Sequence, residues 1–117
     1  MNIETLREYC ISKKGVSECF PFDETSLVFK VMDKMFALTD LEEELWVNLK
    51  CDPELALALR EEYEFVEPGY HMNKKHWNTI RIHDYVPDKL IHEWVDHSYH
   101  LVVKSLTKKQ QTELNKL

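Results

Sequence analysis

Two short apolar segments separated by only two residues place the tightest constraint on the fold. Residues 26–31 (Ser-Leu-Val-Phe-Lys-Val) and 34–38 (Lys-Met-Phe-Ala-Leu) have the β-branched and aromatic content of strands. The intervening Met32-Asp33 is a two-residue connection, and a connection this short joins neighbouring strands as an antiparallel hairpin. The sequence therefore predicts an antiparallel sheet.

Two further strands are predicted, with a helix between them. Residues 45–49 (Leu-Trp-Val-Asn-Leu) again combine β-branched and aromatic side chains, and residues 77–83 alternate apolar and polar side chains at the period of a strand. Asp52 followed by Pro53 has the residue types of a helix cap and a first helical position. A helix over residues 53–62 follows from this signal.

Helices are also predicted at both ends of the chain. Residues 3–14 form an amphipathic pattern between a capping Asn2 and Gly15, a residue that commonly ends helices. Residues 88–106 carry apolar side chains at three- and four-residue steps, which predicts a long helix. Residues 108–117 either form a last short helix or fray.

The order of these elements defines the fold class. A helix, three or four strands, a helix, a strand and a helix predict an α+β fold, in which an antiparallel sheet carries its N-terminal, middle and C-terminal helices on one face as a two-layer sandwich. A length of 117 residues suits one domain, so residues 1–117 are predicted to form a single domain.

Charge is unevenly distributed along the chain. The net charge of −6 argues against a protein that binds nucleic acid over its whole surface. Residues 40–68 hold ten acidic residues against Lys50 and Arg60, whereas residues 69–83 hold Lys74, Lys75 and Arg81 and no acid. A surface with separate acidic and basic regions is therefore expected.

The N-terminal residues and the cysteines indicate the cellular compartment. The first residues, Met-Asn-Ile-Glu-Thr-Leu-Arg-Glu, carry acids where a signal peptide would be basic and then apolar, and no apolar stretch approaches the ~20 residues that span a bilayer. Cys10, Cys19 and Cys51 are odd in number and form no CxxC motif, which fits reduced thiols. We expect a cytoplasmic protein with three free cysteines.

The segment from Gly69 to Ile80 has an unusual density of polar side chains. After the Pro68-Gly69 turn it packs two histidines, two lysines, two asparagines and a tryptophan into twelve residues and ends in the predicted strand. A segment that only buries apolar area does not need this composition. It is therefore the first candidate for a functional surface.

Four blocks, in the same order along the chain, resemble the MmcQ/YjbR family. They are Lys30-Val-Met-Asp-Lys-Met-Phe-Ala-Leu38, Val47-Asn-Leu-Lys-Cys-Asp-Pro-Glu-Leu-Ala56, the segment Gly69–Ile80, and Ser98-Tyr99-His-Leu-Val102. The resemblance implies a compact fold similar to frataxin and to type III secretion chaperones. It also implies DNA binding, the function commonly attached to the family, and identifies no catalytic residues.

Together, the composition of the segment and the resemblance predict a low-affinity DNA-binding surface on residues 70–81. Lysine and arginine would meet phosphates, asparagine would bond base edges or sugars, and an aromatic ring would stack. The predicted contact residues are Tyr70, His71, Asn73, Lys74, Lys75, His76, Asn78 and Arg81. Trp77 is interpreted mainly as the buried anchor of its strand, with base stacking as the alternative.

Two other binding functions remain open from the sequence. By analogy with secretion chaperones, the chain would be a protein-interaction module that uses the acidic surface of residues 40–68 or an exposed sheet edge. A small-ligand pocket between the sheet and the last long helix, floored by Trp77 and Tyr99, is the third possibility. The purely structural interpretation of Ser98-Tyr99 is that this pair packs the helix against the sheet and forms hydrogen bonds between them.

No catalytic or metal site is predicted. His71 and His76 are five apart, and His97 and His100 are three apart, but no cysteine or carboxylate joins either pair at a zinc spacing. Cys51 at a helix N-terminus could have a lowered pKa, yet no motif identifies a substrate. We expect a monomer without enzymatic activity, cofactor or metal.

Overall fold

The computed structural model describes residues 1–117 as one six-stranded antiparallel sheet with four helices. Along the sheet the strand order is β1-β2-β3-β4-β6-β5. The strands are β1 (Val16–Cys19), β2 (Ser26–Val31), β3 (Lys34–Asp40), β4 (Trp46–Lys50), β5 (Val66–Pro68) and β6 (Trp77–Arg81). The predicted α+β class with an antiparallel sheet is confirmed.

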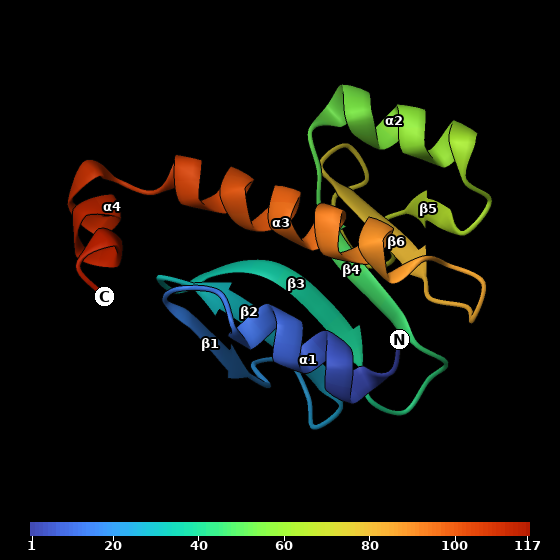
Figure 1. The fold of residues 1–117 in the computed structure, drawn as a ribbon, viewed down its shortest axis with the longest axis horizontal. Coiled ribbons are helices and arrows are strands. Elements are labelled where there is room, and N and C mark those ends of the chain that lie inside the picture. Colours follow the sequence, from blue (N-terminus) through green and yellow to red (C-terminus); the bar gives the residue numbers. More distant parts are fainter.

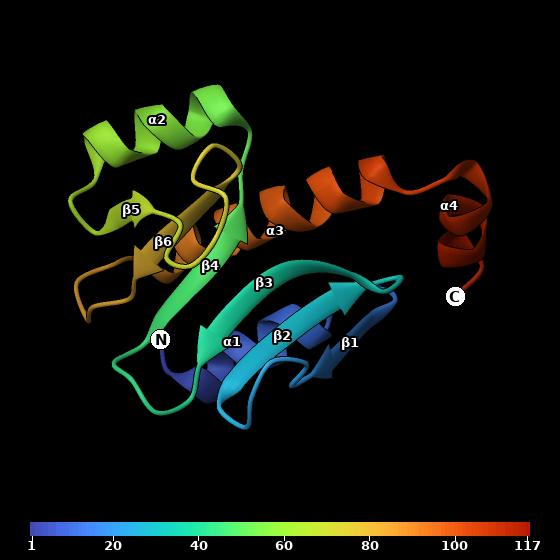
Figure 2. The same cartoon turned by 180° about the vertical axis from the view of Figure 1, so that it is seen from behind.

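The helices form the second layer. They are α1 (Ile3–Ile11), α2 (Pro53–Glu62), α3 (Asp88–Ser105) and α4 (Lys108–Asn115). In Figure 1, α1 and α3 lie in front of the sheet, and α2 lies above the end formed by β5 and β6. Seen from behind, no helix covers the sheet, and the chain between β5 and β6 crosses β4 and β6 (Figure 2). We call this second side the outer face.

The hairpin has the backbone that its two-residue turn requires. Met32 and Asp33 both have positive φ, 49° and 67°, which is the requirement of a type I′ turn. Val31 then pairs with Lys34, and the ladder continues to Ser26 and Asp40 after one irregularity. The predicted turn is confirmed.

The helix starts also follow the sequence signals. Asn2 accepts a 2.8 Å bond from the backbone N–H of Thr5, and Asp52 accepts one of 3.3 Å from Leu55. The first helix ends at Ile11, earlier than expected, because the chain turns through residues 12–15 and Gly15 has a φ of +73°. The final segment is helical, and its Leu114 is buried.

Two edge strands were not predicted. β1 and β5 have four and three residues, too few to establish a period, and β5 ends at Pro68, a residue that only an edge strand tolerates. The sheet therefore has six strands where the sequence indicated four or five.

Serine and tyrosine of α3 join the two layers. The Ser98 hydroxyl donates a 2.6 Å bond to the carbonyl oxygen of Phe36 and accepts one of 2.9 Å from the N–H of Lys50. The Tyr99 ring meets Phe36 edge-on at 5.5 Å. The prediction that this pair attaches the helix to the sheet is confirmed.

Both faces of the sheet bury apolar side chains, to very different extents. The main core of 24 buried residues lies between the sheet and the helices. A second cluster on the outer face comprises Val28, Leu38 and Trp46, with Met35 and Met72 packed against it. The outer face is therefore partly covered by loops, and this arrangement positions the candidate site. No helix of the chain is long and apolar enough to cross a membrane.

Candidate functional site

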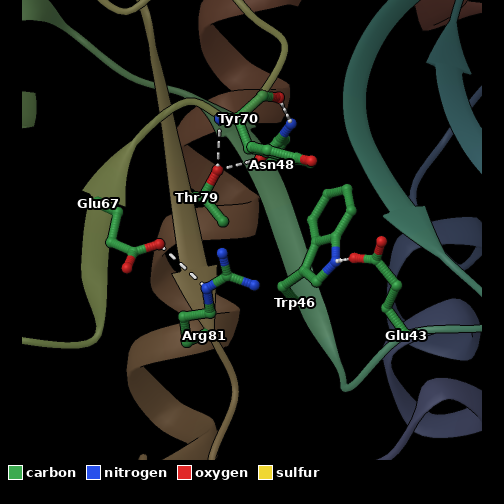
Figure 3. A network of polar contacts seen from close by, with 7 residues as sticks. All are labelled: Glu43, Trp46, Asn48, Glu67, Tyr70, Thr79 and Arg81. Atoms are coloured by element: carbon green, nitrogen blue, oxygen red, sulfur yellow. Dashed lines mark hydrogen bonds and ion pairs between the residues drawn. The ribbon is translucent and has the colours of Figure 1, made fainter.

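A buried polar network fixes the loop of residues 69–76 to the outer face. Asn48 of β4 and Thr79 of β6 are fully buried and hydrogen-bonded to each other. The Asn48 amide donates a 2.8 Å bond to the carbonyl oxygen of Tyr70, and the Thr79 hydroxyl accepts one of 2.8 Å from the Tyr70 N–H (Figure 3). Two side chains on paired strands thus hold both backbone groups of Tyr70.

Further bonds make this loop rigid. The Lys74 ammonium donates to the Gly69 carbonyl at 2.8 Å, and the Asn73 carboxamide oxygen accepts from the N–H of Lys75 at 2.9 Å. The guanidinium of Arg60 donates to the carbonyl oxygens of Lys74 and Trp77. The loop is therefore held both by its own polar side chains and by Arg60 of α2.

Trp77 and Gly69 pack closely at the base of the loop. Trp77 is only 8% exposed but belongs to neither apolar cluster. A Cβ added at Gly69 would lie 2.7 Å from the Trp77 Cβ, too near for any side chain. The interpretation of Trp77 as a buried strand anchor is confirmed, whereas the ring lies outside the main core.

Several predicted DNA-contact residues are committed to these internal bonds. Asn78 is 2% exposed and lies on the helix-covered face, where it bonds Arg60 and the carbonyl oxygen of Ala56. The Arg81 guanidinium donates a 3.0 Å bond to Glu67. The side chains of Lys74 and Asn73 are hydrogen-bonded to the backbone of the loop itself. Asn78 is thus unable to join a surface with the rest of the loop.

The remaining predicted residues are Tyr70, His71, Lys75 and His76. The first three are exposed and His76 is half-buried. His71 adopts a positive φ of 59°, a rare backbone for a non-glycine residue. Tyr70 and His71 line a cavity that the sequence did not indicate.

This cavity, which we call the outer hollow, has a volume of ≈ 370 Å³. Strands β2, β3 and β4 supply its floor, and the β1–β2, β3–β4 and β5–β6 loops supply its walls. Its lining residues are Phe22, Asp23, Ser26, Leu38, Asp40, Glu43, Trp46, Tyr70, His71 and Met72. The volume is within the range of small-ligand pockets.

Three carboxylates of the outer hollow are held in place but carry no counter-charge. Asp23 accepts bonds from the N–H groups of Thr25 and Ser26 at 2.9 and 2.6 Å, and these bonds lower the pKa of Asp23 below its ordinary value. Asp40 accepts from the N–H of Glu42, and Glu43 from the Trp46 indole, at 2.8 and 2.7 Å. None of the three carboxylates forms an ion pair.

Aromatic rings line the same space. The Trp46 and Tyr70 rings meet edge-on at 6.1 Å, and the Tyr70 ring lies 4.0 Å from that of His71. Phe22 is 68% exposed although it is fully apolar. The outer hollow combines unpaired negative charge with accessible aromatic surface, a combination that attracts cations.

Sequence reasoning missed Phe22, Asp23 and Trp46 as site residues. The only local signal is the presence of Pro21 and Asp23, residue types that are typical of a turn but indicate no binding site. The hollow is formed by segments far apart in the chain, so no single sequence motif predicts it.

The space between the sheet and α3 is filled. Its largest void, beside Leu49, Cys51 and His97, has a volume of only ≈ 10 Å³. Trp77 lies on the outer side, and the Tyr99 hydroxyl donates to the carbonyl oxygen of Lys14 at 2.5 Å. The third possibility left open by the sequence, a ligand pocket floored by Trp77 and Tyr99, is not present, because side chains close that space.

The lowered pKa that the sequence left open for Cys51 is not found. Burial, followed by the nearby Asp52 carboxylate, raises the pKa of Cys51 to about 11, so the thiol is protonated at neutral pH. The nearby Arg60 guanidinium acts in the opposite direction but does not offset burial. No three His, Cys, Asp or Glu side chains of the chain lie close enough to hold a metal ion.

Comparisons with known proteins extend over the whole fold. Residues 11–101 match the sequence model of the YjbR family. The protein YjbR of Escherichia coli (strain K12) is 36% identical over 118 residues, covering 100% of both chains. YyaQ of Bacillus subtilis (strain 168) is 36% identical over 75 residues, 64% of this chain and 63% of that protein.

Solved structures have the same architecture. The crystal structure of Deinococcus radiodurans protein DR2400 is similar with a TM-score of 0.90 and 41% identity, covering 97% of this chain and 88% of that one. A Pseudomonas syringae protein has a TM-score of 0.75 and 28% identity, covering 86% and 98%. The names of these proteins assign no activity, so the comparisons establish family and fold.

Proposed function

The chain belongs to the YjbR family, and we propose that it is a non-catalytic binding module that holds a protein partner at the outer hollow. The observation that supports this most is the set of three carboxylates that line the hollow without any counter-charge. Two of them, Asp40 and Glu43, belong to the acidic segment of residues 40–68.

Exposed apolar side chains at the same end of the sheet as the hollow favour a protein as the partner. Ser26 pairs with Asp40, so the β1–β2 and β3–β4 loops lie at the same end of the sheet. The β1–β2 loop exposes Phe22 by 68% within the hollow, and Phe20 and Leu41 are exposed by 46% each around a second depression that Ile3 and Arg7 of α1 also line. Apolar side chains grouped beside polar ones mark interaction surfaces, and a partner larger than a metabolite would cover both.

Duplex DNA fits this surface less well. Lys74 and Arg81 donate to internal acceptors, Asn78 is buried, and the adjoining hollow is acidic. The exposed Lys75, which does not line the hollow, would be the main remaining phosphate contact in a chain of net charge −6. Repulsion at the hollow would oppose the few phosphate contacts that remain.

The charges of the hollow suit binding better than proton transfer. A general acid or base works best when its pKa lies near the working pH. Hydrogen bonds instead lower the pKa of Asp23, which keeps this carboxylate ionised at neutral pH. A fixed negative charge attracts a ligand and takes no part in proton exchange.

Selection from a phage-displayed peptide library tests the proposal. Peptides enriched on the wild type would be measured against Phe22→Ala, in the hollow, and Leu57→Ala, a similarly exposed apolar residue on α2. We expect about tenfold weaker binding for Phe22→Ala and a change within about twofold for Leu57→Ala. A short DNA duplex would be titrated in parallel at low salt.

Two results would contradict the proposal. One is a set of selected peptides that bind both variants equally well. The other is duplex DNA bound more tightly than any peptide, with affinity lost in Lys75→Glu.

A further inference from the structure

We infer that the group recognised in the outer hollow is the guanidinium of an arginine side chain of the partner. This inference rests on the proposed function and names the chemistry of the same site. Asp40 and Glu43 would accept its N–H groups, and the Phe22 and Tyr70 rings would cover its plane.

Two carboxylate oxygens of the hollow have no partner within the chain. Glu43 uses Oε2 to accept the Trp46 indole N–H at 2.7 Å, and no donor of the chain reaches its Oε1. Asp40 uses Oδ1 for the N–H of Glu42, which leaves Oδ2 free. Figure 3 shows the Trp46 indole reaching toward Glu43, the bond that orients this carboxylate. The free acceptors therefore belong to two different side chains with fixed neighbours.

The placement of these acceptors on two different side chains favours one kind of cation over others. A metal ion requires its ligands to converge, and no three acidic or histidine side chains of the chain do so. An ammonium is a compact point charge, whereas a guanidinium presents five donors on a planar fork. The fork can reach acceptors on separate side chains at once, which favours arginine over lysine.

The aromatic surface favours the same group. Phe22 and Tyr70 are 68% and 45% exposed, so their rings are accessible to a bound ligand. A guanidinium stacks on aromatic faces and is more weakly hydrated than an ammonium. Bringing arginine against these rings therefore removes less hydration than bringing lysine would.

The other residues that line the hollow give it a negative electrostatic potential, which attracts a cationic side chain. Asp23 is the third carboxylate, held ionised by its hydrogen bonds, and no lysine or arginine lines the hollow. His71, the one histidine of the lining, lies against the Tyr70 ring.

Nuclear magnetic resonance titration with capped tripeptides tests the inference on the full chain. The probes are acetyl-Gly-Xaa-Gly-amide with arginine, lysine, citrulline or leucine at Xaa, and the indole N–H signal of Trp46 is the reporter. Citrulline keeps the shape of arginine but is uncharged. Asp40→Asn with Glu43→Gln preserves the internal acceptors while removing both charges, and Glu61→Gln with Glu62→Gln on α2 is the matched control.

We expect the arginine peptide to shift the Trp46 signal and to bind about fivefold more tightly than the lysine peptide, with citrulline and leucine about tenfold or more weaker. The hollow variant should lose about tenfold for arginine, and the α2 control should not change. Lysine or leucine binding as tightly as arginine would overturn the inference and leave the proposed function standing. If none of the peptides perturbs any residue of the hollow, both are overturned.

Discussion

The indole N–H of Trp46 donates a 2.7 Å hydrogen bond to Oε2 of Glu43, three residues earlier in the chain. The indole is 5% exposed, so a buried strand residue fixes the orientation of an exposed carboxylate. The same ring meets Tyr70 edge-on and packs with Val28 and Leu38. Trp46 therefore connects the outer apolar cluster to the charge of the hollow.

Substitutions of Glu43 and Trp46 should show that the charge of Glu43 contributes little to stability, whereas the Trp46 side chain contributes more. Glu43→Gln retains an acceptor oxygen for the indole, so we expect the free energy of unfolding to change by no more than about 0.5 kcal/mol. Trp46→Phe removes buried volume and the indole donor, and should cost about 1–3 kcal/mol. Urea denaturation measures both, and an equal loss in the two variants would contradict the assigned geometry.

The bond network under Tyr70 yields a second prediction. Thr79→Val keeps the side-chain shape but removes the hydroxyl that donates to Asn48 and accepts from the Tyr70 N–H. Buried polar groups left without partners should lower the free energy of unfolding by about 1–3 kcal/mol. Thr112→Val, at an exposed position of α4, should change it by less than about 0.5 kcal/mol in the same denaturation experiment. Equal losses at the two positions would show that the network contributes nothing.

The three cysteines should differ sharply in reactivity. Burial raises the pKa of Cys10 to about 12 and, with Asp52, that of Cys51 to about 11. Cys19 lies half-buried on the edge strand β1. An aromatic disulfide reagent should therefore modify one thiol quickly in the native protein, and mass spectrometry should locate it at Cys19. Fast modification of Cys51 would contradict its placement.

A pH-dependent loss of stability should originate at His97. The Asp52 N–H donates a 3.2 Å bond to His97 Nε2, which only the neutral imidazole can accept. Burial lowers the pKa of His97 below its ordinary 6.5; the Asp52 carboxylate opposes the shift and His100 adds to it. Because the folded-state pKa is the lower one, this stability is present above the unfolded pKa and is lost as the pH falls through the folded pKa.

Comparison of variants isolates that contribution. His97→Gln supplies an acceptor that does not titrate, so its unfolding free energy should fall less than that of the wild type between about pH 7 and about pH 5. His83→Gln, an exposed histidine, should follow the wild type. Parallel pH profiles for the wild type and His97→Gln would refute the role of His97.

Local signals in the sequence were sufficient for most of the fold. Asn2 and Asp52 cap helices where their types and positions indicate, and Met32-Asp33 forms a type I′ turn, one of the two types favoured by so short a connection. The edge strands escaped prediction because three or four residues carry no periodicity. Their pairing depends on the neighbouring strand, and no local pattern encodes it.

The site was less accessible to sequence reasoning because both faces of β6 are covered. Alternation predicts a strand there, but it does not say which face the helices occupy. Asn78 points to the helix side, where its side chain is hydrogen-bonded to Arg60 and to the carbonyl oxygen of Ala56. Thr79 points to the outer face, where its hydroxyl accepts a bond from Tyr70. The outer hollow is lined by Phe22, Trp46 and Tyr70, and only the tertiary structure brings these residues to one cavity.

A chemical-shift map of the whole backbone, recorded as the tightest selected peptide is added, tests the central claim most directly. If the outer hollow is the contact surface, the largest shifts will fall in residues 22–26, 40–46 and 70–72, with little change on α2 or α4. Largest shifts at residues 73–76, or along the free edge of β1, with the hollow unperturbed, would contradict the account.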